Sequence, residues 1–216
     1  AEHQVGVAFF ERSSVNEEFK QGLAKYSLII TGSNWNQKIL TNNGINHAEM
    51  IHQGVDRSKF NSIPIPRILN RPFVIFAGGK LEARKGQDIV IEAFKRFNKY
   101  CPNSILIACW GNLGNVGLHT IAASKYVTDS PKNGDAKSIF KWLIKNDIAQ
   151  SNLMVPEIMA NSHLPNIMKQ ADVAVFTSRC EGGTNLMAME TLACGIPTLI
   201  SANTGHLDLI EMGITH

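Results

Sequence analysis

Short apolar runs alternate with helix-like spacing of apolar residues along most of the chain. From residue 71 onward, apolar runs bounded by turn-forming residues predict strands at 73–77, 104–109, 152–155, 171–176 and 197–201. Between these runs, apolar residues three and four positions apart predict helices over 90–97, 136–148, 163–170 and 186–193. Strands that alternate with helices through right-handed crossovers form a parallel sheet covered on both faces. We therefore expect an α/β fold with a doubly wound, parallel sheet.

Two details of this pattern carry further expectations. In the helix over 136–148, Ile139, Leu143 and Ile144 should share the side that faces the sheet. The segment 111–135 is rich in Gly, Asn, Ser and Thr, and predicts a long loop or insertion with a short helix near 119–126.

The first 70 residues follow a different pattern. A strand is expected at 26–31, a helix capped by Ser33 reaches to about residue 40, and a second strand is expected at 50–55. Prolines 64 and 66 keep the segment around them out of normal sheet pairing. One strand–helix–strand unit is too small to bury a core alone. We therefore expect the tail of one domain at 1–55, an interdomain linker at 56–70, and a second domain at 71–216.

Composition and charge narrow the classes of function. Of the 216 residues, 44% are hydrophobic and the net charge is only +3, so the chain can bury a core and shows no basic stripe for nucleic acid. No leader opens the chain, and no apolar run has the roughly 18–20 residues that cross a bilayer. We expect a cytoplasmic protein with no transmembrane segment, whose peripheral contact with a membrane stays open. The cysteines are expected to be buried free thiols in a reducing compartment, without zinc spacing: Cys101, Cys109, Cys180 and Cys194.

The loop after the strand at 73–77 carries candidate chemistry. Two glycines are followed by Lys80, Arg84 and Lys85 near the start of a helix. Glycine lets the backbone approach a ligand closely, and positive charge at a helix start suits a phosphate or diphosphate. Neither the G-x-x-x-x-G-K-[ST] nor the G-x-G-x-x-G spacing is present. The loop predicts an anion site, with a solvated basic turn as the alternative.

A second candidate loop follows the strand at 171–176. Glu181 precedes two glycines and a helix start, whose free backbone N–H groups can hold an anion, and Glu190 lies within that helix. Carboxylates repel phosphate, so we expect both glutamates to accept hydrogen bonds from sugar hydroxyls, with Glu190 facing the loop and adding nothing to the core. The alternative is a turn residue and a helix-surface residue.

Together these loops resemble the nucleotide-sugar-binding domain of retaining glycosyltransferases of family 4, which have the GT-B fold. Residues 76–86 read FAGGKLEARKG and are similar to the family's G-R-L-x-x-x-K-G loop, with Lys80 in place of Arg. Residues 189–197 read METLACGIP and are similar to L-E-A-M-A-x-G-x-P. Residues 52–60 read HQGVDRSKF and resemble the N-G-V-D-x-x-x-F segment between acceptor and donor domains. Residues 182–189 separate the two glutamates, one more than in the family's E-x₇-E.

The resemblance implies a hexosyl- or glycosyltransferase of polysaccharide biosynthesis. It would move a sugar, with retention, from a nucleotide sugar to a saccharide or other hydroxyl acceptor. Residues 1–55 would be the tail of the acceptor domain and 71–216 the Rossmann-like donor domain, so this chain alone would transfer sugar weakly or not at all. Because the chain begins at Ala1 and ends within a helical pattern, we expect it to be a piece of a longer or incompletely sampled sequence.

The resemblance also assigns roles to residues. Glu181 would be catalytic through contact with the donor sugar, and Glu190 would bind the ribose. The donor-binding residues would be Gly79, Lys80, Lys85, Gly182, Gly183, Thr184, Asn185, Leu186 and Glu190. The loop 156–158 would contact the base, and neither a metal nor any other cofactor is implied. His163 and His206 are expected to be ordinary surface or loop residues, and Glu11 is a weaker candidate for the acceptor-side cleft.

Three other classes of protein are alternatives to this interpretation. A nicotinamide-dependent oxidoreductase would need the G-x-G-x-x-G fingerprint, which is absent. A GT-A glycosyltransferase would need a D-x-D metal motif, which is also absent. A non-catalytic nucleotide-sugar-binding module stays open, because Lys80 and the longer glutamate spacing both depart from the family pattern.

Overall fold

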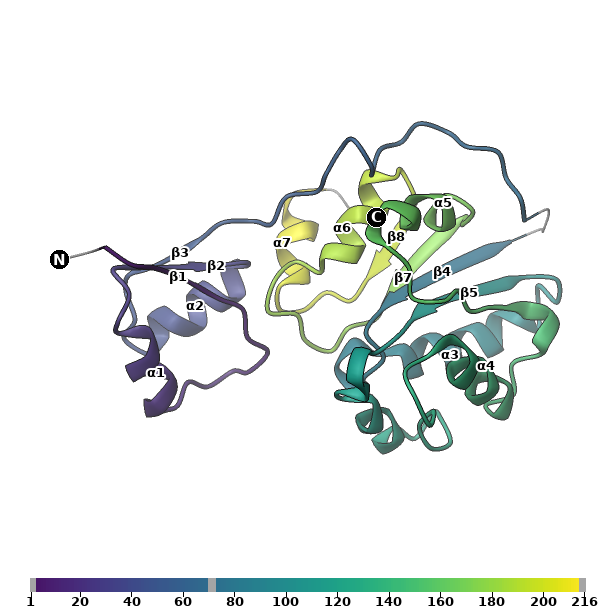
Figure 1. Cartoon of the computed structure of the whole chain (residues 1–216), viewed down its shortest axis with the longest axis horizontal. Coiled ribbons are helices and arrows are strands. Elements are labelled where there is room, and N and C mark those ends of the chain that lie inside the picture. The colour runs from purple at the N-terminus through teal and green to yellow at the C-terminus, as the bar shows by residue number, and fades with distance from the viewer. Residues whose placement is uncertain (1–2, 70–72, 214–216) are drawn as a thin grey trace.

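The computed structural model describes residues 3–69 and 73–213, and in this part of the chain two parallel sheets are flanked by helices (Figure 1). The larger sheet has five strands in the order β6-β5-β4-β7-β8, all paired in parallel. The expected α/β fold with a doubly wound parallel sheet is therefore confirmed. Its strands are β4 (Val74–Gly79), β5 (Ile105–Trp110), β6 (Leu153–Met154), β7 (Val173–Phe176) and β8 (Thr198–Ile200).

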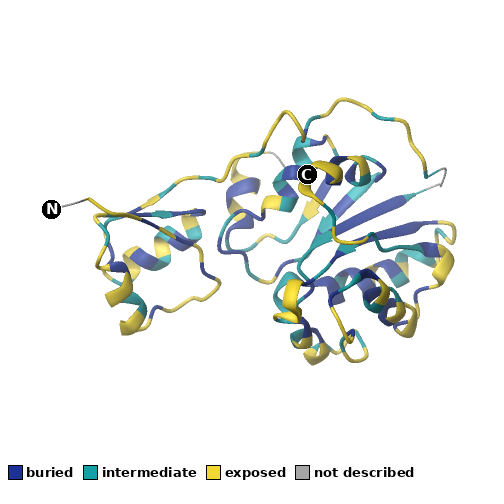
Figure 2. Cartoon of the chain, viewed as in Figure 1, coloured by how far each residue is buried: buried dark blue, intermediate teal, exposed yellow. Residues whose placement is uncertain are grey.

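Helices cover both faces of this sheet, and successive residues of β4 alternate between them. Ile75 and Ala77 pack with one apolar cluster, whereas Val74 and Phe76 pack with the other. The central strands are accordingly buried (Figure 2). The α-helices are α3 (Gln87–Asn98), α4 (Ala136–Lys145), α5 (Leu164–Met168), α6 (Leu186–Ala193) and α7 (His206–Glu211). The 3₁₀ turns are η1 (Ala83–Lys85), η2 (Leu113–Asn115), η3 (Leu118–Ala123), η4 (Gln150–Asn152) and η5 (Asn161–His163).

The smaller sheet has the order β1-β2-β3, with α1 and α2 packed on it. Its elements are β1 (Val5–Ala8), α1 (Glu17–Leu23), β2 (Leu28–Thr31), α2 (Asn34–Asn42) and β3 (Ala48–Met50). The strand expected at 50–55 was wrong, because β3 pairs with β2 from Ala48 to Met50 and ends there. Neither β1 nor α1 was predicted, since Gly6 interrupts the apolar run of the strand. Ser33 caps α2 as expected, its hydroxyl accepting from the Asn36 N–H at 3.2 Å.

Other expectations need smaller corrections. The helix expected over 136–148 ends at Lys145, and Ile144 is 40% exposed while Ile139 and Leu143 are fully buried. Ile144 lies one position, or about 100°, past Leu143, which turns it away from the sheet. The helix expected over 163–170 is a 3₁₀ turn followed by α5, and the strand at 152–155 shortens to two residues.

The four cysteines differ in their burial. All four cysteines are free, but only Cys194 is buried, and the other three are half-buried near element ends or loops.

The segment before the larger sheet has no regular structure. Residues 51–69 form no helix or strand, and Arg67 anchors them through a bidentate ion pair with Asp172. The expected boundary at residues 70 and 71 lies outside the described residues. None of the helices described is long and apolar enough to cross a membrane.

Candidate functional site

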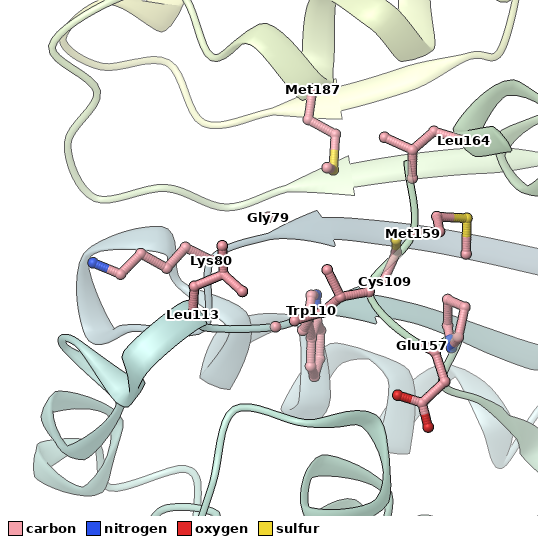
Figure 3. Close-up of a pocket in the computed structure, with 12 residues that line it drawn as sticks. Gly79, Lys80, Cys109, Trp110, Leu113, Glu157, Met159, Leu164 and Met187 are labelled. Carbon is pink, nitrogen blue, oxygen red and sulfur yellow. The ribbon is translucent and has the colours of Figure 1, made fainter. Parts of the chain in front are cut away.

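A cavity of about 270 Å³ lies at the carboxyl ends of β4 and β5 (Figure 3). Met187 points from α6 toward the end of β4, and Met159 lies on the neighbouring loop after β6. Burial raises the pKa of the Cys109 thiol to about 11, so at neutral pH Cys109 is an uncharged side chain in the wall of the cavity. The cavity is lined by Gly79, Lys80, Cys109, Trp110, Gly111, Leu113, Pro156, Glu157, Ile158, Met159, Leu164 and Met187. The loop 156–158, expected to contact a base, therefore lies at this cavity.

Two glycines end β4 for different reasons. A Cβ on Gly78 would lie 2.1 Å from the Met187 sulfur, so a side chain there would displace the Met187 side chain that lines the cavity. Gly79 has φ of +116°, a backbone conformation that other residues rarely adopt. The sequence predicts that these glycines let a ligand approach, and in the structure Gly78 also makes room for Met187.

The carboxylate of Glu181 lies in a buried cluster of charge, which Glu82 and Arg84 connect to the cavity-lining Lys80. The Lys85 ammonium lies 2.8 Å from both carboxylate oxygens, and Arg84 Nη1 lies 3.2 Å from Oε2. Ser178 donates a 2.5 Å hydrogen bond to Oε1, and Asn185 Nδ2 donates to the same oxygen at 3.1 Å. Burial alone would raise the pKa of Glu181, but Lys85, Ser178 and Arg84 together hold the pKa below its usual value. Glu181 is therefore an ionised acceptor.

Arg84, named in the predicted anion loop but given no role by the family resemblance, also belongs to this cluster. Its guanidinium lies 2.6 Å from Glu82 and 3.5 Å from Glu11 of the segment after β1, and it donates to the Cys180 carbonyl. Burial would lower the pKa of Arg84, but the three glutamates around it raise the pKa overall. The one available signal was its position beside Lys85 in a basic loop. Glu11, the weaker candidate for the acceptor-side cleft, follows a strand of the smaller sheet and joins this cluster through its ion pair with Arg84.

Lys80 lines the cavity but is not free of partners. Its ammonium lies 3.2 Å from Glu82, the same carboxylate that holds Arg84, and its side chain is 40% exposed. Glu82 therefore tethers both cations. Lys80 and Lys85 are expected to bind one diphosphate together. In the structure each forms an ion pair with a different carboxylate, Lys80 with Glu82 and Lys85 with Glu181.

The glycine loop before α6 is held by the smaller sheet and by α7. Ser33 Oγ donates to the Gly182 carbonyl at 2.7 Å, and a Cβ on Gly182 would lie 2.6 Å from the Phe10 carbonyl oxygen. Gly183 packs against the Phe9 ring, and Gly205 packs against the Gly183 carbonyl. These contacts leave no room for larger side chains.

The residues at the start of α6 lie in different environments. Asn185 caps the helix with φ of +63° and joins the Glu181 cluster. Thr184 is fully buried, and its hydroxyl contacts the Met189 sulfur beside a separate apolar hollow. Leu186 is 39% exposed. Of these predicted residues, Asn185 contacts Glu181, which also binds Lys85. Thr184 lines the separate apolar hollow instead.

Glu190 is buried, so the expectation that it faces the loop and adds nothing to the core is wrong. Its side chain accepts a 2.9 Å hydrogen bond from Asn161, in the segment that follows the cavity-lining loop 156–159. Burial raises the pKa of Glu190, and the Asn161 hydrogen bond offsets only part of that rise. Glu190 lies three residues after Met187 on α6, and side chains at this spacing share a helix face. It therefore lies on the cavity side of α6.

His206 also differs from expectation, because it is fully buried rather than a surface or loop residue. It is the first residue of α7, and its ring contacts Asn185 and Ser201. His163 is exposed, as expected. Within residues 3–69 and 73–213, no three His, Cys, Asp or Glu side chains gather in a way that could hold a metal ion.

Residues 58–216 match the family model described as glycosyl transferases group 1. No curated protein matches the sequence. Among solved structures, HepE of Anabaena in complex with UDP-glucose aligns with a TM-score of 0.68 and 17% identity, over 96% of this chain and 55% of that chain. TarM of S. aureus, in a complex that includes UDP, aligns with a TM-score of 0.66 and 14% identity, over 96% and 38%.

An E. coli structure described as trehalose-6-phosphate with UDP-2-fluoro glucose aligns with a TM-score of 0.64 and 15% identity, over 93% and 51%. The chain thus spans between 38% and 55% of the length of these three structures. Identities this low show a shared fold, the Rossmann-like α/β fold of GT-B glycosyltransferases. Because the matched family model covers well over half of the residues, this chain belongs to the group 1 glycosyl transferases.

Proposed function

We propose that this chain carries the donor site of a retaining glycosyltransferase of family 4, which moves a sugar from a nucleotide sugar to a hydroxyl acceptor. The observation that carries the proposal is the cavity between β4, β5 and α6, whose Lys80 is linked through Glu82 and Arg84 to the cluster around Glu181. A mostly apolar cavity with a few convergent charges is typical of ligand sites at the carboxyl ends of parallel strands.

The charges around the cavity suit a departing diphosphate. Lys85 directs two N–H groups at Glu181, which leaves the third donor of the ammonium for a phosphate oxygen. Lys80 and the first N–H groups of α6 would add positive charge where the diphosphate leaves. Glu181, ionised and fixed by its partners, would accept a hydrogen bond from the donor sugar. No metal or further cofactor is part of this proposal.

The remaining walls suit a nucleoside. Met159, Met187 and neutral Cys109 offer an apolar surface, and the loop 156–158 offers backbone groups to a base. Glu190, on the same side of α6, would accept from the ribose hydroxyls. UDP is named with the HepE and TarM structures, so a UDP sugar is the donor we propose first.

The proposed division of the chain follows from the two sheets. Residues 1–55 would be the tail of an acceptor domain, 56–70 a linker and 71–216 the donor domain of a cytoplasmic enzyme of polysaccharide biosynthesis. The acceptor must be held against the anomeric carbon, and such positioning contributes roughly 7–11 kcal/mol of barrier lowering. We propose that these 216 residues alone transfer sugar slowly or not at all. The second candidate, a non-catalytic nucleotide-sugar-binding module, is favoured by the tethering of Lys80 to Glu82.

Calorimetric titration with UDP-, GDP- and ADP-glucose tests the proposal. We expect one of these donors to bind, and Lys80→Ala to weaken it about tenfold, because a charged partner of the diphosphate is lost. Lys99→Ala, at an exposed lysine just after α3, is the matched control and should change nothing. No binding by any donor would contradict the donor site. Binding followed by sugar transfer in the longer parent chain would exclude the non-catalytic module.

A further inference from the structure

His206 is a buried histidine to which the proposed function gives no role. Its ring is fully buried at the start of α7, with Nε2 at 3.2 Å from Asn185 Nδ2. On the other side of the ring, Nδ1 lies 3.1 Å from both the hydroxyl and the carbonyl oxygen of Ser201. A fully buried imidazole with partners at both nitrogens has a defined protonation state.

The partners of Ser201 determine which ring nitrogen carries the proton. The Ser201 hydroxyl donates its one hydrogen to the Ser178 carbonyl, so toward His206 it can only accept. The Ser201 carbonyl also accepts only. Nδ1 must therefore be the donor, which leaves Nε2 with a free lone pair facing Asn185.

Asn185 connects this lone pair to Glu181. Its Nδ2 amino group carries two hydrogens, one directed at His206 Nε2 and the other at Glu181 Oε1, 3.1 Å away. The amide oxygen of Asn185 faces the Ala188 N–H of the helix that it caps, so the three contacts together fix the orientation of the amide. A chain of hydrogen bonds therefore runs from Ser201 through His206 and Asn185 to the Glu181 carboxylate, which Lys85 also contacts.

We propose that neutral His206 is a positioning residue for Glu181, acting through the side-chain amide of Asn185, and that protonation of His206 releases this hold and weakens the donor site. The proposal rests on the proposed function, since it adds control by pH to the same site. A proton on Nε2 would place an N–H against the Asn185 amino group. Rotating that amide would then direct its oxygen at the Glu181 carboxylate, which is repulsive.

The charges around His206 favour its neutral form. Burial lowers the pKa of His206, Glu181 raises it, and Lys85 on the far side of that carboxylate lowers it again. On α7 itself, Asp208 lies 3.1 Å from the His52 ring. Because the pKa of His206 is lowered from its ordinary value of 6.5, the neutral form predominates at neutral pH and is lost only as the pH falls through this lowered pKa.

Titration of UDP-glucose from about pH 8 down to the lowest pH at which the protein stays folded tests the inference, because the lowered pKa places the charge change of His206 at the acid end of this range. In the wild type we expect affinity to fall on the acid side. His206→Gln places a non-titrating oxygen near the position of Nε2, so affinity at neutral pH should stay within about twofold and most of the acid loss should disappear. His206→Leu has no acceptor for Asn185 and should bind about tenfold more weakly even at neutral pH.

Two controls separate other histidines from His206. His3→Gln, at an exposed position, should keep the wild-type pH profile. His52→Gln, at the histidine that contacts Asp208 of α7, should keep that profile as well. An acid loss that persists unchanged in His206→Gln, or wild-type affinity in a folded His206→Leu, would overturn the inference. Should the leucine variant not fold, the profile of the glutamine variant decides alone.

A second measurement needs no ligand, so it stays valid if no nucleotide sugar binds and the proposed function fails. Carbon-13 NMR of the glutamate carboxyl groups should show a higher pKa for Glu181 in His206→Leu than in the wild type, because Asn185 no longer directs its N–H at that carboxylate. In His206→Gln the pKa should match the wild type. Equal Glu181 pKa values in the wild type and the leucine variant would overturn the positioning role independently of donor binding.

Discussion

At the scale of single residues, the surroundings shift the pKa values of the two glutamates of the site in opposite directions. Glu181 is surrounded by Lys85, Arg84 and Ser178, and its pKa is lowered despite burial. Glu190 has one neutral partner, Asn161, and its pKa is raised by burial. The number of charged partners, rather than depth alone, therefore decides the direction in which the pKa of each carboxylate shifts.

Replacing Glu190 with glutamine separates stability from binding. Its folded pKa lies above the ordinary 4.5, so in the window above 4.5 the folded state binds more protons, and the free energy of unfolding falls as the pH rises. Glu190→Gln removes that cost and keeps an oxygen for Asn161, so at neutral pH we expect it to raise the free energy of unfolding by about 0.5–2 kcal/mol. The gain should shrink as the pH falls through the raised pKa of Glu190 toward 4.5, and should be absent below 4.5.

The same variant should bind UDP about tenfold or more weakly, because the ribose hydroxyls lose a charged acceptor. Urea unfolding at neutral and acid pH, with calorimetry of UDP, measures both effects. Unchanged affinity would refute the ribose role of Glu190, and lower stability at neutral pH would refute the cost of burying its charge.

The residues of the site were only partly accessible from the sequence. Lys85 and Glu181 were predicted from adjacent loops, and the structure joins them at 2.8 Å. Arg84 could not be distinguished from a solvated lysine or arginine, since its partners Glu11 and Glu181 are distant in the sequence. His206 was misjudged because its burial depends on Asn185 and Ser201, which no local pattern links to it.

At the scale of elements, the N-terminus of α2 connects the smaller sheet to the candidate site. The Ser33 hydroxyl accepts from the Asn36 N–H and also donates to the Gly182 carbonyl in the loop before α6. The next N–H, that of Asn34, donates to Asp208 of α7 at 2.8 Å. One helix start thus contacts both elements that hold Glu181 and His206.

Comparing two helix caps tests this connection. Asn16→Ala removes the cap of α1 at an exposed site and should lower the free energy of unfolding by about 1 kcal/mol. Ser33→Ala removes a cap and also leaves the buried Gly182 carbonyl without its donor, so the loss should be about 2–3 kcal/mol. Urea unfolding followed by circular dichroism measures both variants. Equal losses would show that the bond to Gly182 adds nothing.

Elements were predictable where burial imposed a pattern. The central strands β4 and β5 are apolar on both faces and bounded by turn residues, so the sequence located them within one or two residues. The shorter β3 was misplaced, since three residues at a sheet edge carry little pattern and pairing with β2 sets its end. Tertiary pairing overrode local signals there.

At the scale of the whole molecule, two parallel sheets meet around the glycine loop. Contacts between them come from Ser33, Asn34 and Glu11 on one side and from Gly182, Asp208 and Arg84 on the other. The parallel architecture was predictable from alternating strand and helix patterns. The contact surface was not, because it joins residues more than 70 positions apart in the sequence.

The central claim is that a nucleotide binds in the cavity at the carboxyl ends of β4 and β5. The seven methionines offer built-in probes, since Met159 and Met187 line this cavity, while Met189 and Met212 line the separate apolar hollow and Met50 lies in the smaller sheet. Methyl NMR of methionine-labelled protein, titrated with UDP, tests the claim most directly. We predict saturable shifts of the Met159 and Met187 methyl signals and little change in those of Met212 and Met50. Saturable shifts confined to Met189 and Met212, or no shifts at all, would contradict the claim.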